Sequence, residues 1–179
     1  MPKWEEKVSN PQSTDFQTPE EVCKYMVNMI PKHARTILEP TPGDGNLVRA
    51  LQGFRVTAPK NFFDLDPLLR FDSIVMNPPF SSKHGHSIPD DLQKSGMLFG
   101  YHILEECMEK SDSVIALMPW FTITDSDVRL RRIYRYGLKS ITALPRKTFG
   151  YTRIQTCIFE MRRGWTGHTL FYPFEFNKP

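Results

Sequence analysis

The stretch ILEPTPGDGNLV, residues 37–48, passes from apolar residues through a proline- and glycine-rich segment and back to apolar residues. Residues 36–40 predict a short strand, and the segment from Leu47 to Gln52 predicts a helix. Gly43 and Gly45 lie between the predicted strand and the predicted helix. They would let the backbone approach a ligand closely, and the helix N-terminus would favour an anion. A tight strand-to-helix turn without any ligand uses the same residue types. The stretch therefore predicts a strand–loop–helix unit whose loop either binds a ligand or only turns the chain.

Strand and helix patterns alternate along the rest of the chain. A first helix is expected after Thr18, which we predict as its cap with Glu21 completing a capping box, and Pro31 ends it. Further strands are expected at 54–58, 71–77, 113–119, 139–145, 153–161 and 168–174, and further helices at 97–110 and 125–137. This alternation predicts an α/β fold with a doubly wound, mostly parallel sheet and helices on both faces. We expect one domain over 1–179, with an irregular N-terminal arm (1–16), a mobile loop (81–96) and a C-terminal tail (162–179).

The composition is that of an ordinary soluble globular protein. The chain has 179 residues, 40% of them hydrophobic and 24% charged, and a formal net charge of +3. No segment has the length and apolar character of a membrane span or a signal peptide, so we expect a cytoplasmic protein without a membrane partner. Cys23, Cys107 and Cys157 lack metal-ligand spacing, and we interpret them as buried apolar residues. The mildly basic charge is compatible with a polyanionic partner.

A second motif ends the predicted strand at 71–77. Asn77-Pro78-Pro79-Phe80 places an amide, two rigid residues and an aromatic ring at the carboxyl end of a core strand. The Asn77 side chain and the Pro78 carbonyl could accept two hydrogen bonds from one amine, and Phe80 could supply a flat face beside them. Exocyclic base amines need such acceptors because their lone pair is delocalised into the ring. A strand end capped by asparagine would look the same.

The order and spacing of four segments now indicate a family. DFQTPEEV (15–22), ILEPTPGDGN (37–46), FDSIVMNPPF (71–80) and LPRKTFGYTRIQTCIFEM (144–161) together resemble the S-adenosylmethionine-dependent, adenine-specific DNA methyltransferases with an NPPF motif. The resemblance implies a Rossmann-like class I methyltransferase fold, S-adenosylmethionine as cofactor, DNA as partner, and methyl transfer to the exocyclic N(6) amine of adenine.

The resemblance also implies roles for individual residues. The residues expected at the cofactor are Gln17, Thr18, Pro19, Glu39, Pro40, Gly43, Asp44, Gly45, Asn61 and Phe62. The residues expected to be catalytic are Asn77, Pro78, Pro79 and Phe80, and those expected to hold an extruded base are Phe80 and Phe149.

The chain departs from the family pattern at two places. One strand and its helix are missing after the first strand–loop–helix unit, together with the acid that binds the cofactor's ribose, and Asn61 stands where an acid is usual. We expect no target-recognition domain after residue 161, and the resemblance then implies a minimal, phage-like or bacterial enzyme of short or relaxed specificity. A second copy of the chain or a partner subunit could contribute to sequence recognition.

Several alternatives remain open at this point. A protein glutamine or an RNA base would fit the same amine clamp, and the lost strand and acid would also suit a non-catalytic module that binds S-adenosylmethionine or nucleic acid. We expect no metal, and we interpret His84, His86 and Asp90 as exposed. The basic run at 129–135 is interpreted as a solvated helix face around a stripe formed by Leu130, Ile133 and Tyr134.

Overall fold

The fold is built on a mixed sheet, seen in a computed structural model that describes residues 17–84, 88–150 and 154–177. In the described residues the strands are β1 (Thr36–Leu38), β2 (Arg55–Thr57), β3 (Ser73–Met76), β4 (Ser113–Pro119), β5 (Leu138–Ala143), β6 (Thr156–Arg162) and β7 (Leu170–Pro173). Their order in the sheet is β2-β1-β3-β4-β6-β5-β7. The first four strands are parallel, β6 is antiparallel to both β4 and β5, and β7 pairs in parallel with β5.

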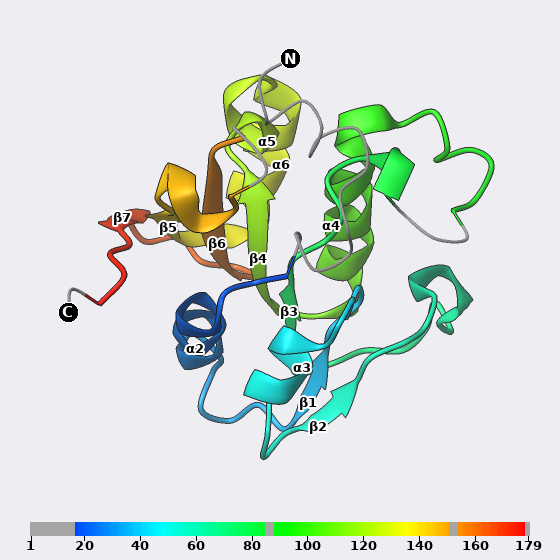
Figure 1. Cartoon of the computed structure of the whole chain (residues 1–179), viewed down its shortest axis with the longest axis horizontal. Helices are drawn as coiled ribbons and strands as arrows, with labels where there is room; N and C mark the ends of the chain where they lie inside the picture. Colours follow the sequence, from blue (N-terminus) through cyan, green and yellow to red (C-terminus); the bar gives the residue numbers. More distant parts are fainter. Residues whose placement is uncertain (1–16, 85–87, 151–153, 178–179) are drawn as a thin grey trace.

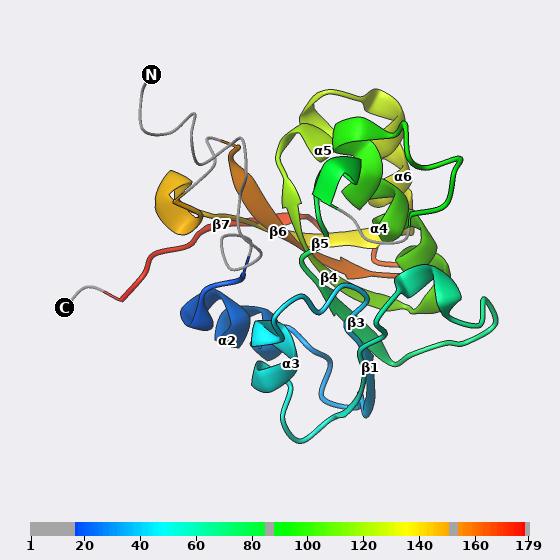
Figure 2. The ribbon, with the colours of Figure 1, turned by 45° about the vertical axis from the view of Figure 1, so that its right-hand side comes forward.

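Helices cover both faces of this sheet. The described α-helices are α2 (Glu20–Asn28), α3 (Asn46–Ala50), α4 (Phe99–Lys110), α5 (Phe121–Thr124) and α6 (Asp127–Gly137). Successive side chains of a strand point to opposite faces, and the core divides accordingly. On β4, Ile115 belongs to the apolar cluster that includes residues of α2 and α3, whereas Val114 belongs to the cluster that includes residues of α4 and α6. Figures 1 and 2 show α2 and α3 on one side of the sheet and α4 and α6 on the other.

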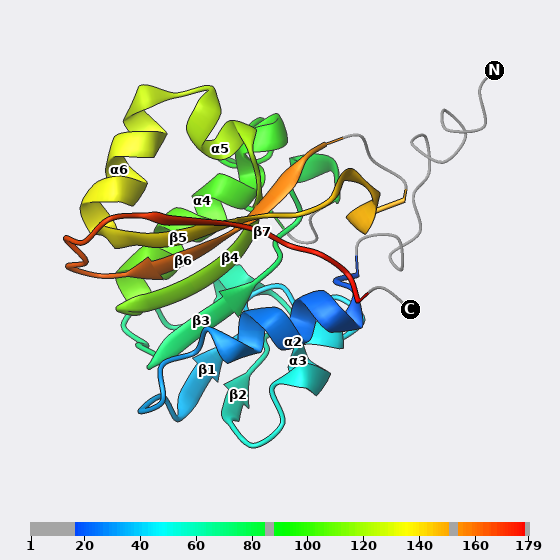
Figure 3. The same ribbon diagram turned by 90° about the vertical axis from the view of Figure 1, so that its left-hand side faces the viewer.

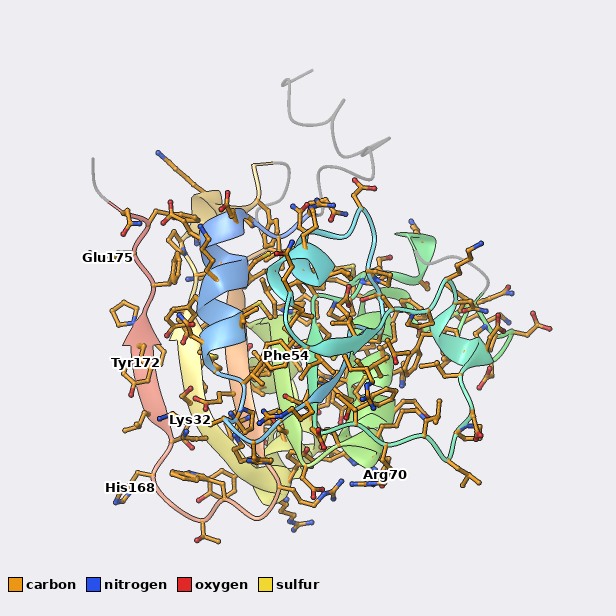
Figure 4. All side chains as sticks on the ribbon, turned by 90° about the horizontal axis from the view of Figure 1, so that it is seen from below. Lys32, Phe54, Arg70, His168, Tyr172 and Glu175 are labelled. Carbon is orange, nitrogen blue, oxygen red and sulfur yellow. The ribbon has the colours of Figure 1, made fainter. Side chains whose placement is uncertain are left out.

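The predicted α/β architecture is confirmed, including the missing unit. Between β2 and β3 the chain forms only a short 3-10 helix, Phe62–Asp64, and no additional strand. At the opposite edge β7 adds a strand that the sequence predicted at 168–174 (Figure 3). The tail is therefore partly structured, and Tyr172 on β7 lies at the outer edge of the molecule (Figure 4). The other short 3-10 helices of the described chain are Ser82–His84, Gly96–Leu98 and Arg146–Thr148.

Local predictions at the helix ends had mixed outcomes. The sequence allows Asp125 or Ser126 as the cap of α6, and Ser126 caps it by accepting a hydrogen bond from the Arg129 N–H. The predicted cap of α2 is wrong, because Pro19 occupies the N-cap and no side chain bonds to the first turn. Thr18 has a different hydrogen-bond partner, described below, and the Glu21 carboxylate accepts from the Asn177 N–H. Helix α5 was not predicted, because its few residues carry no periodicity.

The predicted apolar stripe on α6 is also partly wrong. Ile133 is buried, but Leu130 and Tyr134 are 38% and 62% exposed. Tyr136 completes the buried side of the helix instead, three residues from Ile133. The basic face is not simply solvated, since the Arg129 side chain donates to two backbone carbonyls of α5.

Gly137 gives the strongest steric constraint in the described chain. Its φ is +131°, and a Cβ there would overlap the backbone carbonyl oxygen of Arg162 and lie 2.8 Å from the Trp165 nitrogen. We expect Gly137→Ala to lower the free energy of unfolding by about 3 kcal/mol. Gly53 is the matched control: its φ is +94° with nothing within 4 Å of a Cβ, so Gly53→Ala should cost only about 1 kcal/mol. Equal losses in urea denaturation would contradict this assignment.

Candidate active site

Two strand ends meet where the direction of winding reverses. β1 lies between β2 and β3, so the chain moves to one side of β1 after the first crossover and to the other side after the second. Ligands of open α/β sheets bind at the carboxyl ends of strands at such a switch point. Glu39 follows β1 directly and Asn77 follows β3 directly. The two motifs of the sequence therefore lie side by side at this switch point.

Glu39 is a buried carboxylic acid. It is 1% exposed, and its Oε1 accepts a hydrogen bond of 2.9 Å from the Thr41 N–H. Burial raises the pKa of the Glu39 carboxyl to about 8, and the hydrogen bonds from Thr41 only partly offset this rise. None of the ion pairs in the described chain includes Glu39. An ionised Glu39 would therefore be stabilised by a cationic group brought into the site.

The raised pKa of Glu39 makes stability depend on pH. Below pH 4.5 the carboxyl is protonated in both states, and between pH 4.5 and about 8 it ionises more readily in the unfolded chain. From pH 5 to pH 8 the wild type should therefore lose about 3–4 kcal/mol of unfolding free energy through this group. Glu39→Gln keeps the acceptor for Thr41 and should lose correspondingly less. Chemical denaturation of both proteins at the two pH values measures this, and parallel losses would contradict the assignment.

The loop between β1 and α3 contains two glycines in the left-handed backbone region. Gly43 and Gly45 have φ values of +53° and +88°, and the Gly45 N–H donates to the Pro42 carbonyl at 2.8 Å. Pro40 is buried and Asp44 is exposed. The Gln17 side chain lies over Gly43, since a Cβ built on Gly43 would come within 2.6 Å of Gln17 Nε2. The Gln17 side chain, from the segment before α2, thus lies against the glycine loop.

Asn77 is held by two threonines. Its Nδ2 donates to Thr18 Oγ1 at 3.0 Å, and its backbone carbonyl accepts from Thr41 Oγ1 at 3.4 Å. A small pocket brings these groups together and is lined by Gln17, Thr18, Glu39, Thr41, Pro42, Leu47 and Asn77. Thr41, Pro42 and Leu47 were not singled out from the sequence, although they lie within the quoted 37–48 stretch.

The rest of the tetrapeptide packs against the start of α4. Pro78 is buried, whereas Pro79 and Phe80 are partly exposed. A Cβ on Gly100 would lie 3.0 Å from the Pro79 carbonyl oxygen and 3.4 Å from Pro78 Cγ. Gly100 therefore permits the close approach of α4 to the two prolines. In the sequence, Gly100 is an isolated glycine inside a predicted helix, a position that can indicate a close packing contact.

Asn61, Phe62 and Phe149 are among the predicted site residues that do not line this pocket. Asn61 accepts from the Phe63 N–H and donates to Asp64, so it caps the 3-10 helix after β2. Phe62 is 7% exposed and belongs to the core cluster shared with α4. Phe149 is 5% exposed and belongs to the cluster on the other face. Both rings are buried in apolar clusters, so neither ring presents a face to solvent in this structure.

Other sequence observations concern residues away from the pocket. The three cysteines are buried, as interpreted from the sequence. Within 17–84, 88–150 and 154–177, no group of three or more His, Cys, Asp or Glu side chains is arranged to hold a metal ion. His86 lies outside the described residues. None of the helices in those ranges combines the length and apolar character that a membrane crossing requires.

Comparison with solved structures identifies the fold. A protein from Listeria monocytogenes, described as a class I S-adenosylmethionine-dependent methyltransferase, matches 96% of this chain and 70% of its own, with a TM-score of 0.68 and 15% identity. The chain has the class I methyltransferase fold. With that fold, the pocket at the switch point lies where a doubly wound sheet binds its ligand. No family model matches the chain, and no curated protein matches it by sequence.

Two further structures share the class I methyltransferase fold. A protein from Vibrio vulnificus, described as a modification subunit of a type I restriction enzyme, covers 97% of this chain at 20% identity with a TM-score of 0.66. A type I restriction-modification methyltransferase subunit from Streptococcus thermophilus covers 92% at 16% identity, also with a TM-score of 0.66. The present chain spans about half of either protein, at 50% and 49% of their lengths.

Proposed function

We propose that this chain transfers a methyl group from S-adenosylmethionine to the exocyclic N(6) amine of adenine in DNA. The observation that carries the proposal is the convergence of Glu39 and Asn77 on one pocket at the switch point of a class I methyltransferase fold. One motif supplies a buried acid beside a glycine loop, and the other supplies a rigidly held amide. Each motif is only a short local pattern in the sequence. Because the two motifs lie close together, a joint function explains them better than two separate structural roles.

The residues of the pocket fit the proposed cofactor. Its amino-acid end carries an ammonium group, and Glu39 is a buried acid without a cationic partner in the described chain. An ammonium beside it would lower its pKa and favour the carboxylate. Gly43 would allow close backbone approach once the Gln17 side chain moves aside. The bound cofactor would supply an electrophilic methyl group on a sulfonium.

The tetrapeptide fits an amine as the acceptor of the methyl group. In the proposal, Asn77 Oδ1 and the Pro78 carbonyl accept the two amine hydrogens and hold the nitrogen in line for the transfer. Phe80 keeps part of its surface exposed and would stack on the base. Phe149 has no place in this proposal, because its ring lies in the core.

Support for DNA as the substrate is independent of the pocket. Two neighbours of the same fold are described as restriction-modification subunits, and the net charge of +3 suits a polyanion. The chain spans about half of either neighbour, and we propose that sequence recognition involves surface outside the described residues. A second copy or a partner subunit is the proposed source.

A transfer assay with tritiated S-adenosylmethionine tests the proposal. Duplex DNA, single-stranded RNA and a protein extract are offered in parallel, and duplex DNA in which 2-aminopurine replaces adenine is the matched control. We expect label in the adenine-containing DNA alone, recovered as N(6)-methyladenine after digestion. Label in RNA or protein would replace the DNA assignment, and absence of label in every substrate, with cofactor bound, would favour a non-catalytic module.

A further inference from the structure

The Asn46 side chain joins two segments that line the pocket. Asn46 is the first residue of α3, directly after the glycine loop, and its Nδ2 donates a hydrogen bond of 3.0 Å to the carbonyl oxygen of Thr18. Its Oδ1 accepts a hydrogen bond from the Arg49 guanidinium, on the same helix. Gln17 and Thr18 line the pocket, and so does Leu47, the neighbour of Asn46. We call the connection from Arg49 through Asn46 to Thr18 the Asn46 bridge.

The two partners of Asn46 fix the direction in which its amide points. A backbone carbonyl can only accept a hydrogen bond, and a guanidinium can only donate one. A half-turn of the amide would place its NH2 group against the Arg49 guanidinium and its oxygen against the Thr18 carbonyl, and neither contact would be a hydrogen bond. The Asn46 bridge therefore has a single direction, with the NH2 group toward Thr18.

Arg49 is itself held against the glycine loop. Its Nη1 donates to the Asp44 carbonyl oxygen at 2.8 Å, and a Cβ built on Gly45 would lie 3.3 Å from the same nitrogen. The other terminal nitrogen, Nη2, donates to Asn46. The planar guanidinium thus contacts the loop and Asn46 at once, which suits its fork of donors. The Asn46 bridge consequently starts at the glycine loop and ends at the segment before α2.

The backbone of this segment has to stay in place while one of its side chains moves. Thr18 is 3% exposed, and the other hydrogen bond to its carbonyl comes from Cys23 Sγ at 3.5 Å, a weak thiol donor. Gln17, the preceding residue, lies over Gly43 and would have to move aside for a ligand to approach the loop.

We propose that Asn46 is a positioning residue that holds the Thr18 backbone against α3, so that the pocket keeps its shape while the Gln17 side chain makes room for the cofactor. This inference rests on the proposed function. It assigns to cofactor binding a residue that does not itself line the pocket.

Asn46→Asp separates the bridge from any other structural role of Asn46. Aspartate keeps the shape of the side chain and the acceptor for Arg49, and it suits the first turn of a helix. It has no hydrogen to donate, however, and turns an oxygen toward the Thr18 carbonyl. We expect the Kd for S-adenosylmethionine, measured by calorimetry, to rise about 10-fold, the effect of one hydrogen bond, while kcat at saturating cofactor stays within about 2-fold. Asn46→Leu adds no charge and should raise this Kd by a similar factor.

Asn28→Asp is the matched control for the added charge. Asn28 is the exposed last residue of α2, at the opposite end of that helix from Thr18. Its replacement should leave the cofactor Kd within about 2-fold of wild type. Unchanged cofactor affinity in folded Asn46→Asp would overturn the inference, and so would a fall in kcat at saturating cofactor as large as the loss of affinity.

A second measurement needs neither cofactor nor methyl transfer. In ¹⁵N NMR spectra the Asn46 side-chain NH2 signals are assigned by their absence in Asn46→Leu. In the wild type, the amide proton that faces Thr18 should exchange with water more slowly than the other. Equal, fast exchange would overturn the inference even if Asn46→Asp failed to fold. If instead the wild type binds no S-adenosylmethionine, the proposed function fails while the NMR result still decides whether the Asn46 bridge exists.

Discussion

Asn77→Ala should lower the rate of methyl transfer by about 10³-fold while the affinity for S-adenosylmethionine stays within a few-fold of wild type. The Asn77 side chain is one of the two proposed acceptors of the amine hydrogens, and it belongs to the end of β3 rather than to the glycine loop. Removing it takes away an interaction made with the methyl acceptor. The loss should therefore fall on kcat, and calorimetry with the cofactor should show nearly unchanged binding.

Asn77→Asp is the informative companion to this variant. Aspartate keeps the shape of the side chain and two acceptor oxygens, and the Thr18 hydroxyl can donate to one of them. If the role of Asn77 is to accept hydrogen bonds, Asn77→Asp should retain more activity than Asn77→Ala. Wild-type turnover in Asn77→Ala would refute the clamp, and equal loss in both variants would show that the NH2 group matters rather than the oxygen.

The fold was largely predictable because its strands carry strong local signals. β3 is buried at every position, and the continuous apolar run within 71–77 indicated a central strand. The absence of a further strand and helix between β2 and β3 was also predictable, because too few residues separate the two strands to form them. Helix α5 was not predictable, because four residues give no helical period.

The site was predictable in its motifs but not in its contacts. Glu39 and Asn77 were identified from strand ends, and parallel pairing of β1 with β3 brings them together. Thr18 was misassigned as a helix cap because the capping pattern is local, whereas its real partner is distant in the sequence. Phe62 and Phe149 matched a family pattern, but whether an aromatic ring is buried or open depends on the packing of several elements. Gly100 gave no signal of its own, since its importance comes from the prolines opposite.

Gly43→Val should weaken S-adenosylmethionine binding by about 100- to 1,000-fold. Gly43 has a φ of +53°, a conformation that β-branched residues rarely adopt. The added side chain would also point toward Gln17, which lines the pocket, with its Cβ within 2.6 Å of Gln17 Nε2. Gln17 can move, but the valine would then occupy the space through which the cofactor would approach the loop.

Backbone strain alone would weaken folding without blocking the pocket, so the two effects of Gly43→Val need to be separated. Gly53→Val introduces the same side chain at another positive φ, +94°, where nothing lies within 4 Å of the new Cβ. We expect both variants to lose stability in thermal denaturation, because both strain the backbone. Only Gly43→Val should lose cofactor binding in calorimetry at a temperature where both are folded. Unchanged affinity in folded Gly43→Val would mean that the cofactor does not approach the 39–45 loop, and the assignment of this pocket as the cofactor site would have to be abandoned.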